Sequence, residues 1–274
     1  MAFPLCLVVI LGAVFPSDCN TFGASVPTRD PTSSIAPAMP EATDRGMVPT
    51  LNNKGFMSTS LDPVSAAFTI YAGQVNGLSL DLGCAYGIAS LAAVEQGARI
   101  IACDMDAGHV KVLLSKTTRT VSKRIAGLVA EMPKVAFRPN SFSAILCSRA
   151  LHFLNGDDVS ETITAMTEWL EPGGKVFLIT DTPYTGFWAR GAAAYEKRKA
   201  AGDPWPGFIP DVTIYLPDQA RSKAQLRHLN PMDPDTLARV CKEVGLTVEH
   251  ADFSGRPDQP NSKTHAGVIA AKAS

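Results

Sequence analysis

Charge of either sign is not in excess in this sequence of 274 residues: 25 Lys and Arg residues stand against 26 Asp and Glu residues, for a net charge of −1 at pH 7. Without surplus positive charge, the chain lacks the overall electrostatic attraction that draws proteins to nucleic acids and anionic membranes. The apolar run at residues 3–15 is shorter than the roughly 20 residues needed to span a bilayer. We therefore expect no nucleic-acid partner and no stable membrane span.

The sequence also lacks any pair of cysteines in the spacing C-x-x-C, which zinc sites and redox motifs use. Neither a metal site nor a disulfide framework is therefore expected. Three of the six cysteines, Cys84, Cys103 and Cys147, lie in or beside apolar runs, where a free thiol behaves as a small buried hydrophobic side chain. Free thiols favour a reducing compartment, so we expect a cytoplasmic protein.

The first 49 residues have the composition of a leader-like segment followed by a linker. The run at residues 3–15 has the length of a signal-peptide core, but no Lys or Arg precedes it and its cleavage pattern is poor. From residue 16 to about 49, Pro, Ser, Thr, Ala and Gly dominate, a composition that buries too little apolar surface to fold. An export signal, a disordered tail and a start assigned too early, with Met39 or Met47 as the true start, stay open. The folded unit is expected at residues 50–274.

From residue 51 onward, short apolar runs alternate with segments of helical periodicity. Strands that alternate with helices of this length are typical of βαβ units and a parallel sheet. The apolar runs are continuous, as expected for strands that helices cover on both faces. The sequence therefore predicts a doubly wound α/β fold. The predicted strands are residues 78–82, 99–103, 125–129, 143–148 and 175–180, and the predicted helices are residues 62–72, 88–95, 107–122, 159–170 and 233–244.

The loop after the first of these strands indicates a ligand site. In doubly wound sheets, ligands bind beyond the carboxyl ends of the strands. Gly83 and Gly87 allow this loop to turn sharply and to approach a ligand, and the helix after it directs its N–H groups to the same place. The dinucleotide spacing G-x-G-x-x-G would need glycine at Ala85 and glycine or alanine at Ile88. A nucleotide-like ligand other than NAD is therefore expected.

Residues 81–87 (DLGCAYG) resemble the D-x-G-x-(G/A)-x-G motif of the class I S-adenosylmethionine-dependent methyltransferases. The resemblance extends over most of residues 60–273. It implies S-adenosylmethionine as the cofactor and a Rossmann-like sheet of seven strands with the last strand antiparallel, residues 246–253 and 266–273 supplying the final two. The cofactor residues that this motif implies are Asp81, Gly83, Ala85 and Gly87. For Asp81, a cap on the following turn is the alternative.

Two further segments resemble the family's adenosine-binding motifs. Asp104, at the end of the second predicted strand, stands where the family places an acid against the ribose hydroxyls, and Met105 follows it in the implied site. An N-cap of the next helix is the alternative role for Asp104. In residues 130–137 (AEMPKVAF), the resemblance places Glu131 toward the adenine amino group and the backbone N–H of Met132 against the ring.

Two more segments follow in the family's order. Residues 140–148 (NSFSAILCS) resemble the segment N-S-F-D-x-V-x-x-S, although Ser143 replaces the usual Asp, and Ser148 is included in the implied cofactor site. Residues 170–174 (LEPGG) match the L-x-P-G-G turn that precedes the fifth strand.

Methyl transfer from a sulfonium is an in-line displacement, in which the protein mainly positions the acceptor and excludes water. A base tuned near neutral pH can assist an oxygen or nitrogen acceptor, and His152 follows the fourth predicted strand at the ligand-binding end. His152 is therefore the candidate catalytic residue, with packing beside the cofactor as the alternative. Arg149 is a candidate substrate contact, with exposure to solvent as its alternative.

Residues 182–230 form a much longer connection than the few residues that usually join such elements. They hold seven of the 20 aromatic residues, and seven Lys or Arg against four Asp or Glu give them a net charge of +3. We predict a lid over the acceptor that attracts an anionic group and is walled by Tyr184, Trp188 and Trp205. A self-stabilising excursion or a homodimer contact is the alternative.

The sequence thus favours a methyltransferase that acts on an oxygen or nitrogen atom of a small metabolite or natural product. The chain shows no extra recognition domain and no basic stripe, which argues against protein and nucleic-acid acceptors. Two alternatives stay open. One is a non-catalytic S-adenosylmethionine-binding partner or structural protein, and the other is an exported protein of unknown role.

Overall fold

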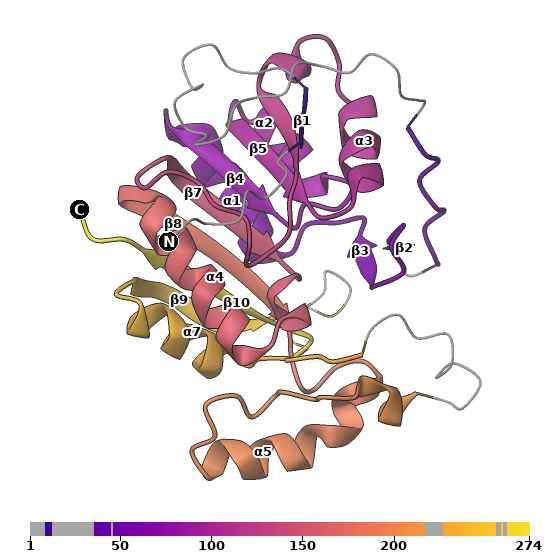
Figure 1. The fold of residues 1–274 in the computed structure, drawn as a ribbon, viewed down its shortest axis with the longest axis vertical. Coiled ribbons are helices and arrows are strands. Elements are labelled where there is room, and N and C mark those ends of the chain that lie inside the picture. Colours follow the sequence, from indigo (N-terminus) through magenta and orange to yellow (C-terminus); the bar gives the residue numbers. More distant parts are fainter. Residues whose placement is uncertain (1–8, 13–35, 45, 217–226, 256–258, 260–261) are drawn as a thin grey trace, which may run out of the picture.

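The computed structural model describes residues 9–12, 36–44, 46–216, 227–255, 259 and 262–274. A twisted sheet runs through the molecule, with helices on both faces and an additional helical region at one end (Figure 1). The four described cysteines are free and buried, which confirms the prediction for Cys84, Cys103 and Cys147 and adds Cys241. Within the described part of the chain, no helix is long and apolar enough to cross a membrane.

Seven strands of the sheet confirm the predicted doubly wound topology. Their order is β6-β5-β4-β7-β8-β10-β9, in which the first five strands are parallel and β10 is antiparallel to both of its neighbours. Chain order reverses beside β4, which has β5 on one side and β7 on the other. The strands are β4 (Leu78–Leu82), β5 (Arg99–Asp104), β6 (Ile125–Val129), β7 (Phe142–Ser148), β8 (Leu170–Asp181), β9 (Thr247–Ser254) and β10 (His265–Ala271).

Five helices cover the two faces of the sheet, and alternate side chains of each strand separate the two cores. On β5, Ile101 and Cys103 join the core under α4 and α7, whereas Ile100 and Ala102 join the core under α1, α2 and α3. Because helices cover both sides, the strands are buried along nearly their whole length. The helices are α1 (Pro63–Gln74), α2 (Ile88–Glu95), α3 (Ala107–Ser115), α4 (Gly156–Trp169) and α7 (Pro234–Glu243).

The sheet has an eighth strand that the sequence analysis did not predict. Strand β1 (Val9–Gly12) pairs antiparallel with the outer edge of β6 and lies inside the run expected to be a leader. A β-branched apolar sequence suits such an edge, whose N–H and C=O groups would otherwise lack sheet partners. The rest of the expected leader and most of the expected linker, at residues 1–8, 13–35 and 45, lie outside the described residues.

Ordered structure also begins before residue 50, where the folded unit was expected to start. Strand β2 (Met47–Pro49) pairs antiparallel with β3 (Phe56–Ser58). The turn between them contains Asn53 at φ 54°, a left-handed conformation that Asn tolerates better than most residues. This β2–β3 hairpin lies beside α3, near the carboxyl ends of the parallel strands (Figure 1).

The largest differences from the predicted boundaries are at the end of α3 and the start of β8. Helix α3 was expected to reach residue 122 but ends at Ser115, where the hydroxyls of Ser115 and Thr117 donate to the carbonyls of Val112 and Leu114, both at 2.7 Å. Such local hydrogen bonds compete with the continuing helix. Strand β8 begins at Leu170, so the predicted turn at residues 170–174 is instead a bulge in which four residues face Ser143 alone.

The long connection after β8 packs against one end of the molecule. It contains η3 (Phe187–Gly191), α5 (Ala192–Ala200) and η4 (Val212–Tyr215). Trp205 within it contacts Gly156 at the start of α4 and lies 5.3 Å from the guanidinium carbon of Arg239 on α7. In Figure 1 this region lies beyond α7, away from the β2–β3 hairpin.

Candidate functional site

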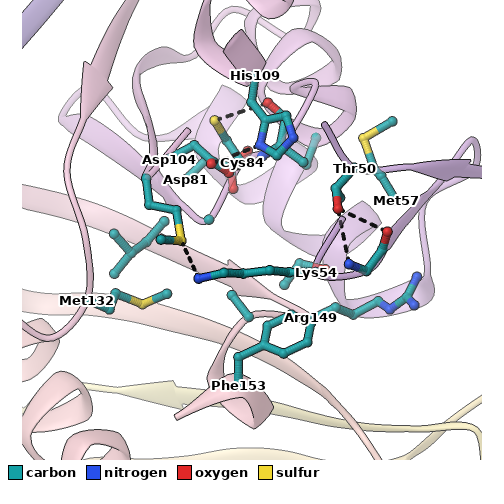
Figure 2. Close-up of a pocket in the computed structure, with 18 of the residues that line it drawn as sticks. Thr50, Lys54, Met57, Asp81, Cys84, Asp104, His109, Met132, Arg149 and Phe153 are labelled. Atoms are coloured by element: carbon teal, nitrogen blue, oxygen red, sulfur yellow. Dashed lines mark hydrogen bonds and ion pairs between the residues drawn. The ribbon is translucent and has the colours of Figure 1, made fainter. Parts of the chain in front are cut away.

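A cavity of about 500 Å³ opens at the carboxyl ends of β4, β5 and β7. That volume falls within the range of roughly 300–1,000 Å³ typical of small-molecule sites. Its wall is formed by the loop after β4, the residues after β5, β6 and β7, and the β2–β3 hairpin (Figure 2). The cavity therefore lies where the topology predicts a ligand.

The glycines of the loop after β4 are required by its conformation and by its neighbours. Gly83 and Gly87 have φ values of 84° and 75°, and Ala85 also adopts a left-handed conformation at 45°. A Cβ atom on Gly87 would lie 2.0 Å from Leu113, and one on Gly83 would lie 2.8 Å from the Cβ of Ala150. Side chains at the two glycines would therefore push the loop away from α3 and from the end of β7.

Asp81 is buried beneath this loop. Its carboxylate accepts a 2.6 Å hydrogen bond from the hydroxyl of Ser90 on α2 and borders the cavity. Burial raises the pKa of Asp81 to about 7, and the hydrogen bond from Ser90 only partly offsets this effect. The carboxylate thus links β4 to α2, and it titrates near neutral pH.

Asp104, at the end of β5, joins three parts of the site. Its Oδ2 accepts the N–H of Ala85 at 2.8 Å, and its Oδ1 accepts the N–H of Asp106 and lies 2.9 Å from Nδ1 of His109. The N-cap of α3 is Asp106, whose side chain accepts the N–H of Gly108, so the structure does not support the alternative role for Asp104. The carboxylate of Asp104 borders the cavity and orients the glycine loop.

The other residues predicted for the cofactor also border the cavity. Met105 is 43% exposed, and its sulfur lies 3.6 Å from the ammonium of Lys54. Met132, which follows the carboxyl end of β6, faces the same space (Figure 2). Glu131 forms an exposed ion pair with Lys134 at 3.1 Å. Ser148 lies at the end of β7, where its hydroxyl oxygen lies 3.4 Å from that of Ser65.

Arg149 follows β7 and also lines the cavity, with a φ of 56°. Its Nε donates to Oδ1 of Asp181 at 3.3 Å, and Nε2 of His265 lies 3.4 Å from the same oxygen. The structure thus brings Arg149, predicted as a substrate contact, to the same cavity as the predicted cofactor residues.

His152, the predicted catalytic residue, does not line the cavity. It is buried with its ring centroid 4.2 Å from that of Phe153, which does line the cavity. Burial lowers the pKa of His152 to about 4, and Nδ1 accepts the backbone N–H of Asp181 at 3.3 Å. A neutral imidazole in this place supports Phe153 and Asp181, which corresponds to the packing alternative.

The predicted aromatic wall of the long connection does not line the cavity either. Tyr184 donates to Glu196, Trp188 donates to the carbonyl of Thr182 at 3.0 Å, and Trp205 packs on α4 and α7. These side chains stabilise the connection itself. Among the described residues of the connection, His228 lines the cavity.

The β2–β3 hairpin is the part of the site that the sequence analysis missed. Val48, fully buried, packs with Tyr86 and Val112, and the hydroxyl of Tyr86 donates to the carbonyl of Pro49 at 2.7 Å. Turn residues at positions 52–55 (NNKG) between two short apolar runs were the available signal. Its residues that line the cavity are Thr50, Asn52, Lys54, Gly55, Phe56, Met57 and Ser58.

His109 connects the hairpin to Asp104. The backbone N–H of Leu51 donates to Nε2 of His109 at 3.0 Å. Because Nε2 accepts this hydrogen bond, Nδ1 carries the proton and donates to Asp104. One neutral imidazole therefore holds the hairpin and the carboxylate at the end of β5 in a fixed relation.

Comparison with known proteins agrees with this geometry. Residues 80–178 match a family described as a methyltransferase domain. A ubiquinone biosynthesis O-methyltransferase of Leptothrix cholodnii is 27% identical in an alignment of 188 positions that covers 65% of this chain and 68% of that protein.

Solved structures share the fold. An S-adenosylmethionine-dependent methyltransferase from Mesorhizobium loti matches with a TM-score of 0.54 at 19% identity, over 76% of this chain and 95% of that one. The 1,6-didemethyltoxoflavin-N1-methyltransferase of Burkholderia thailandensis, solved with 1,6-didemethyltoxoflavin and S-adenosylhomocysteine, matches with a TM-score of 0.54 at 15% identity, over 77% of each chain.

The hydrogen bonds of His109 predict the behaviour of two substitutions. His109→Ala should speed tryptic cleavage after Lys54 by roughly fivefold, because a hydrogen bond contributes about 1 kcal/mol to keeping the hairpin closed. His109→Gln should stay near the wild-type rate, since an amide can both donate and accept. Cleavage after Lys199 on α5 is the internal control. Equal rates for the two variants would contradict this role of His109.

The buried carboxylate of Asp81 predicts a pH dependence of stability. Its folded pKa of about 7 exceeds the ordinary value of 3.8, so the folded state binds the proton more tightly and loses stability as the pH rises between these values. As the pH rises through this interval, the free energy of unfolding measured in urea should fall more steeply in the wild type than in Asp81→Asn. The difference in slope should be about 1.4 kcal/mol per pH unit. Parallel pH profiles for the two proteins would refute the assignment.

Proposed function

Because the chain belongs to the class I S-adenosylmethionine-dependent methyltransferases, we propose that it transfers the methyl group of this cofactor to an oxygen or nitrogen atom of a small-molecule acceptor. One observation carries the proposal. A single cavity is bordered by the carboxylate of Asp104, by the glycine loop, and by apolar side chains of the hairpin and of the segment after β7, among them Met57 and Phe153. It therefore offers places for a nucleoside and for a second, apolar group side by side.

The polar end of the cavity suits the adenosine portion of the cofactor. Asp104 is oriented by three protein donors and still borders the cavity, so Oδ2, which accepts only the N–H of Ala85, can also accept a ribose hydroxyl. Met105 and Met132 line the cavity with polarisable thioethers that suit an adenine ring, and the carboxylate of Glu131, which also lines it, suits the amino group of adenine. The glycines at positions 83 and 87 leave the loop backbone open to the ligand.

The apolar side chains that line the cavity suit a small acceptor. They include aromatic and thioether side chains of the hairpin and of the segment after β7, and such walls exclude water from a bound ligand. The Leptothrix relative is named for O-methylation in ubiquinone biosynthesis, which supports a small-molecule oxygen acceptor for this chain.

When bound, the cofactor supplies an electrophilic methyl group on a sulfonium. The residues of this chain then contribute orientation and the exclusion of water, which are the main requirements of an in-line displacement. His152 is behind the wall, so we assign it no direct proton transfer; it holds Phe153 and Asp181 in place. His228 and Asp158 are among the titratable residues that line the cavity and are candidates to accept a proton from the acceptor.

The proposal is tested by incubating the full chain with methyl-labelled S-adenosylmethionine and a panel of small phenols, catechols and amines. We expect label transfer to at least one class. Asp104→Ala should weaken binding of S-adenosylhomocysteine at least tenfold, because it removes charge-assisted hydrogen bonds.

Asp106→Ala is the matched control for this substitution. It removes the neighbouring acid, which caps α3 and is not on the cavity wall, so it should cost about 1 kcal/mol of stability and leave nucleoside affinity unchanged. The proposal fails if the wild type binds neither nucleoside, or if Asp104→Ala binds as the wild type does.

A further inference from the structure

Arg149 has a backbone conformation that residues other than glycine rarely adopt. Its φ is 56°. Arg149 directly follows Ser148, the last residue of β7, and its backbone N–H donates to the carbonyl of Ile179 on β8 at 2.7 Å. Such left-handed residues cost about 1–3 kcal/mol and gather at functional sites, where the surroundings hold them in place. Here the sheet itself fixes the backbone from which the arginine side chain enters the cavity.

A buried carboxylate holds the inner part of the arginine side chain. Nε donates to Oδ1 of Asp181, while Nε2 of His265 lies 3.4 Å from the same oxygen and Nε2 of His152 lies 3.9 Å from Oδ2. Burial alone would raise the pKa of Asp181, but the facing His152, Arg149 and His265 outweigh it and hold that pKa at about 2. Asp181 thus stays ionised and orients Arg149.

The outer part of the guanidinium has no protein partner among the residues that the structure describes. Of the three side-chain nitrogens of Arg149, only Nε makes a hydrogen bond or ion pair with the described residues, although the side chain is just 20% exposed and lines the cavity. Figure 2 places the guanidinium on the far side of the cavity from Asp104 and Met132. Two terminal NH₂ groups are therefore directed to the cavity end opposite the predicted adenosine site.

The acidic residues of the described cavity wall are all engaged with other protein groups. None of them forms an ion pair with Arg149 in that part of the chain. Asp62 accepts hydrogen bonds from the N–H groups of Val64 and Ser65 and from the hydroxyl of Ser65. Asp81 accepts from Ser90, and Asp104 accepts from Ala85, Asp106 and His109. Glu131 forms an ion pair with Lys134, and Asp158 accepts from Asn155. The acids of the described wall therefore provide no acceptor for the terminal NH₂ groups of Arg149, and a ligand can supply one.

We propose that Arg149 is a carboxylate-binding residue of this site and that Asp181 is its positioning residue. The planar guanidinium presents parallel N–H groups that match a carboxylate in a bidentate arrangement. This inference rests on the proposed function. The carboxylate belongs either to the amino-acid portion of the cofactor or to the acceptor, since both would lie at this end of the cavity.

The cofactor as the source is tested with two nucleosides that differ in the amino-acid portion. Calorimetric titration compares S-adenosylhomocysteine with 5′-methylthioadenosine, which has no carboxylate, in the wild type, Arg149→Met and Arg149→Lys. If the cofactor supplies the carboxylate, Arg149→Met binds S-adenosylhomocysteine about 10- to 100-fold more weakly and binds methylthioadenosine unchanged. Arg149→Lys recovers part of the loss, because it keeps the charge but not the planar fork.

The acceptor as the source is tested by titrating 4-hydroxybenzoate and phenol into each protein saturated with S-adenosylhomocysteine. Binding of 4-hydroxybenzoate in preference to phenol, lost in Arg149→Met while both nucleosides bind normally, assigns the carboxylate to the acceptor. Thermal unfolding of each variant reports any loss of the Asp181 contact. Because that loss would weaken both nucleosides alike, the ratio of the two affinities separates binding from structure.

Two results would overturn the inference. One is an equal loss of affinity for S-adenosylhomocysteine and methylthioadenosine in Arg149→Met, and the other is the absence of any change for every carboxylate probe. If the wild type binds neither nucleoside, the proposed function itself fails and the subsite fails with it.

Discussion

The carboxylate of Asp104 is the group on which the geometry of the site depends. Three elements converge on it: the glycine loop through the N–H of Ala85, the start of α3 through the N–H of Asp106, and the β2–β3 hairpin through the imidazole of His109. A carboxylate at the end of a parallel strand can accept several donors at once. It thereby holds the loop open toward the ligand and the hairpin over the same space.

Steric limits make this arrangement specific. Gly83 and Gly87 cannot carry side chains without contacting Ala150 and Leu113, so the loop packs closely against the end of β7 and against α3. Asp181 accepts a hydrogen bond from Arg149 and orients it, as Asp104 accepts the N–H of Ala85 and orients the glycine loop. The two buried acids lie at the ends of β5 and β8: Asp104 borders the cavity as a hydrogen-bond acceptor, and Asp181 orients a guanidinium whose terminal NH₂ groups have no partner among the described residues.

The sequence predicted the seven strands and the glycine loop because both depend on local patterns, namely continuous apolar runs and residues with special backbone freedom. The position of Asp104 followed from its place after a strand. The hairpin and β1 were missed because their pairing depends on partners far along the chain, such as Val9 with Val129. The roles of His109 and of Asp181 were missed for the same reason, since no local pattern shows which buried polar groups will meet. The aromatic residues of the long connection were wrongly predicted to wall the acceptor site, because composition alone could not show that Trp205 faces α4 and α7 rather than the cavity.

The coupling of the hairpin to the glycine loop is tested most directly by hydrogen–deuterium exchange, followed by mass spectrometry, with and without S-adenosylhomocysteine. The account predicts that the ligand slows amide exchange in residues 83–87 and in residues 47–58 together, because Asp104 and His109 connect the two segments. Slower exchange in the loop with unchanged exchange in the hairpin would contradict it.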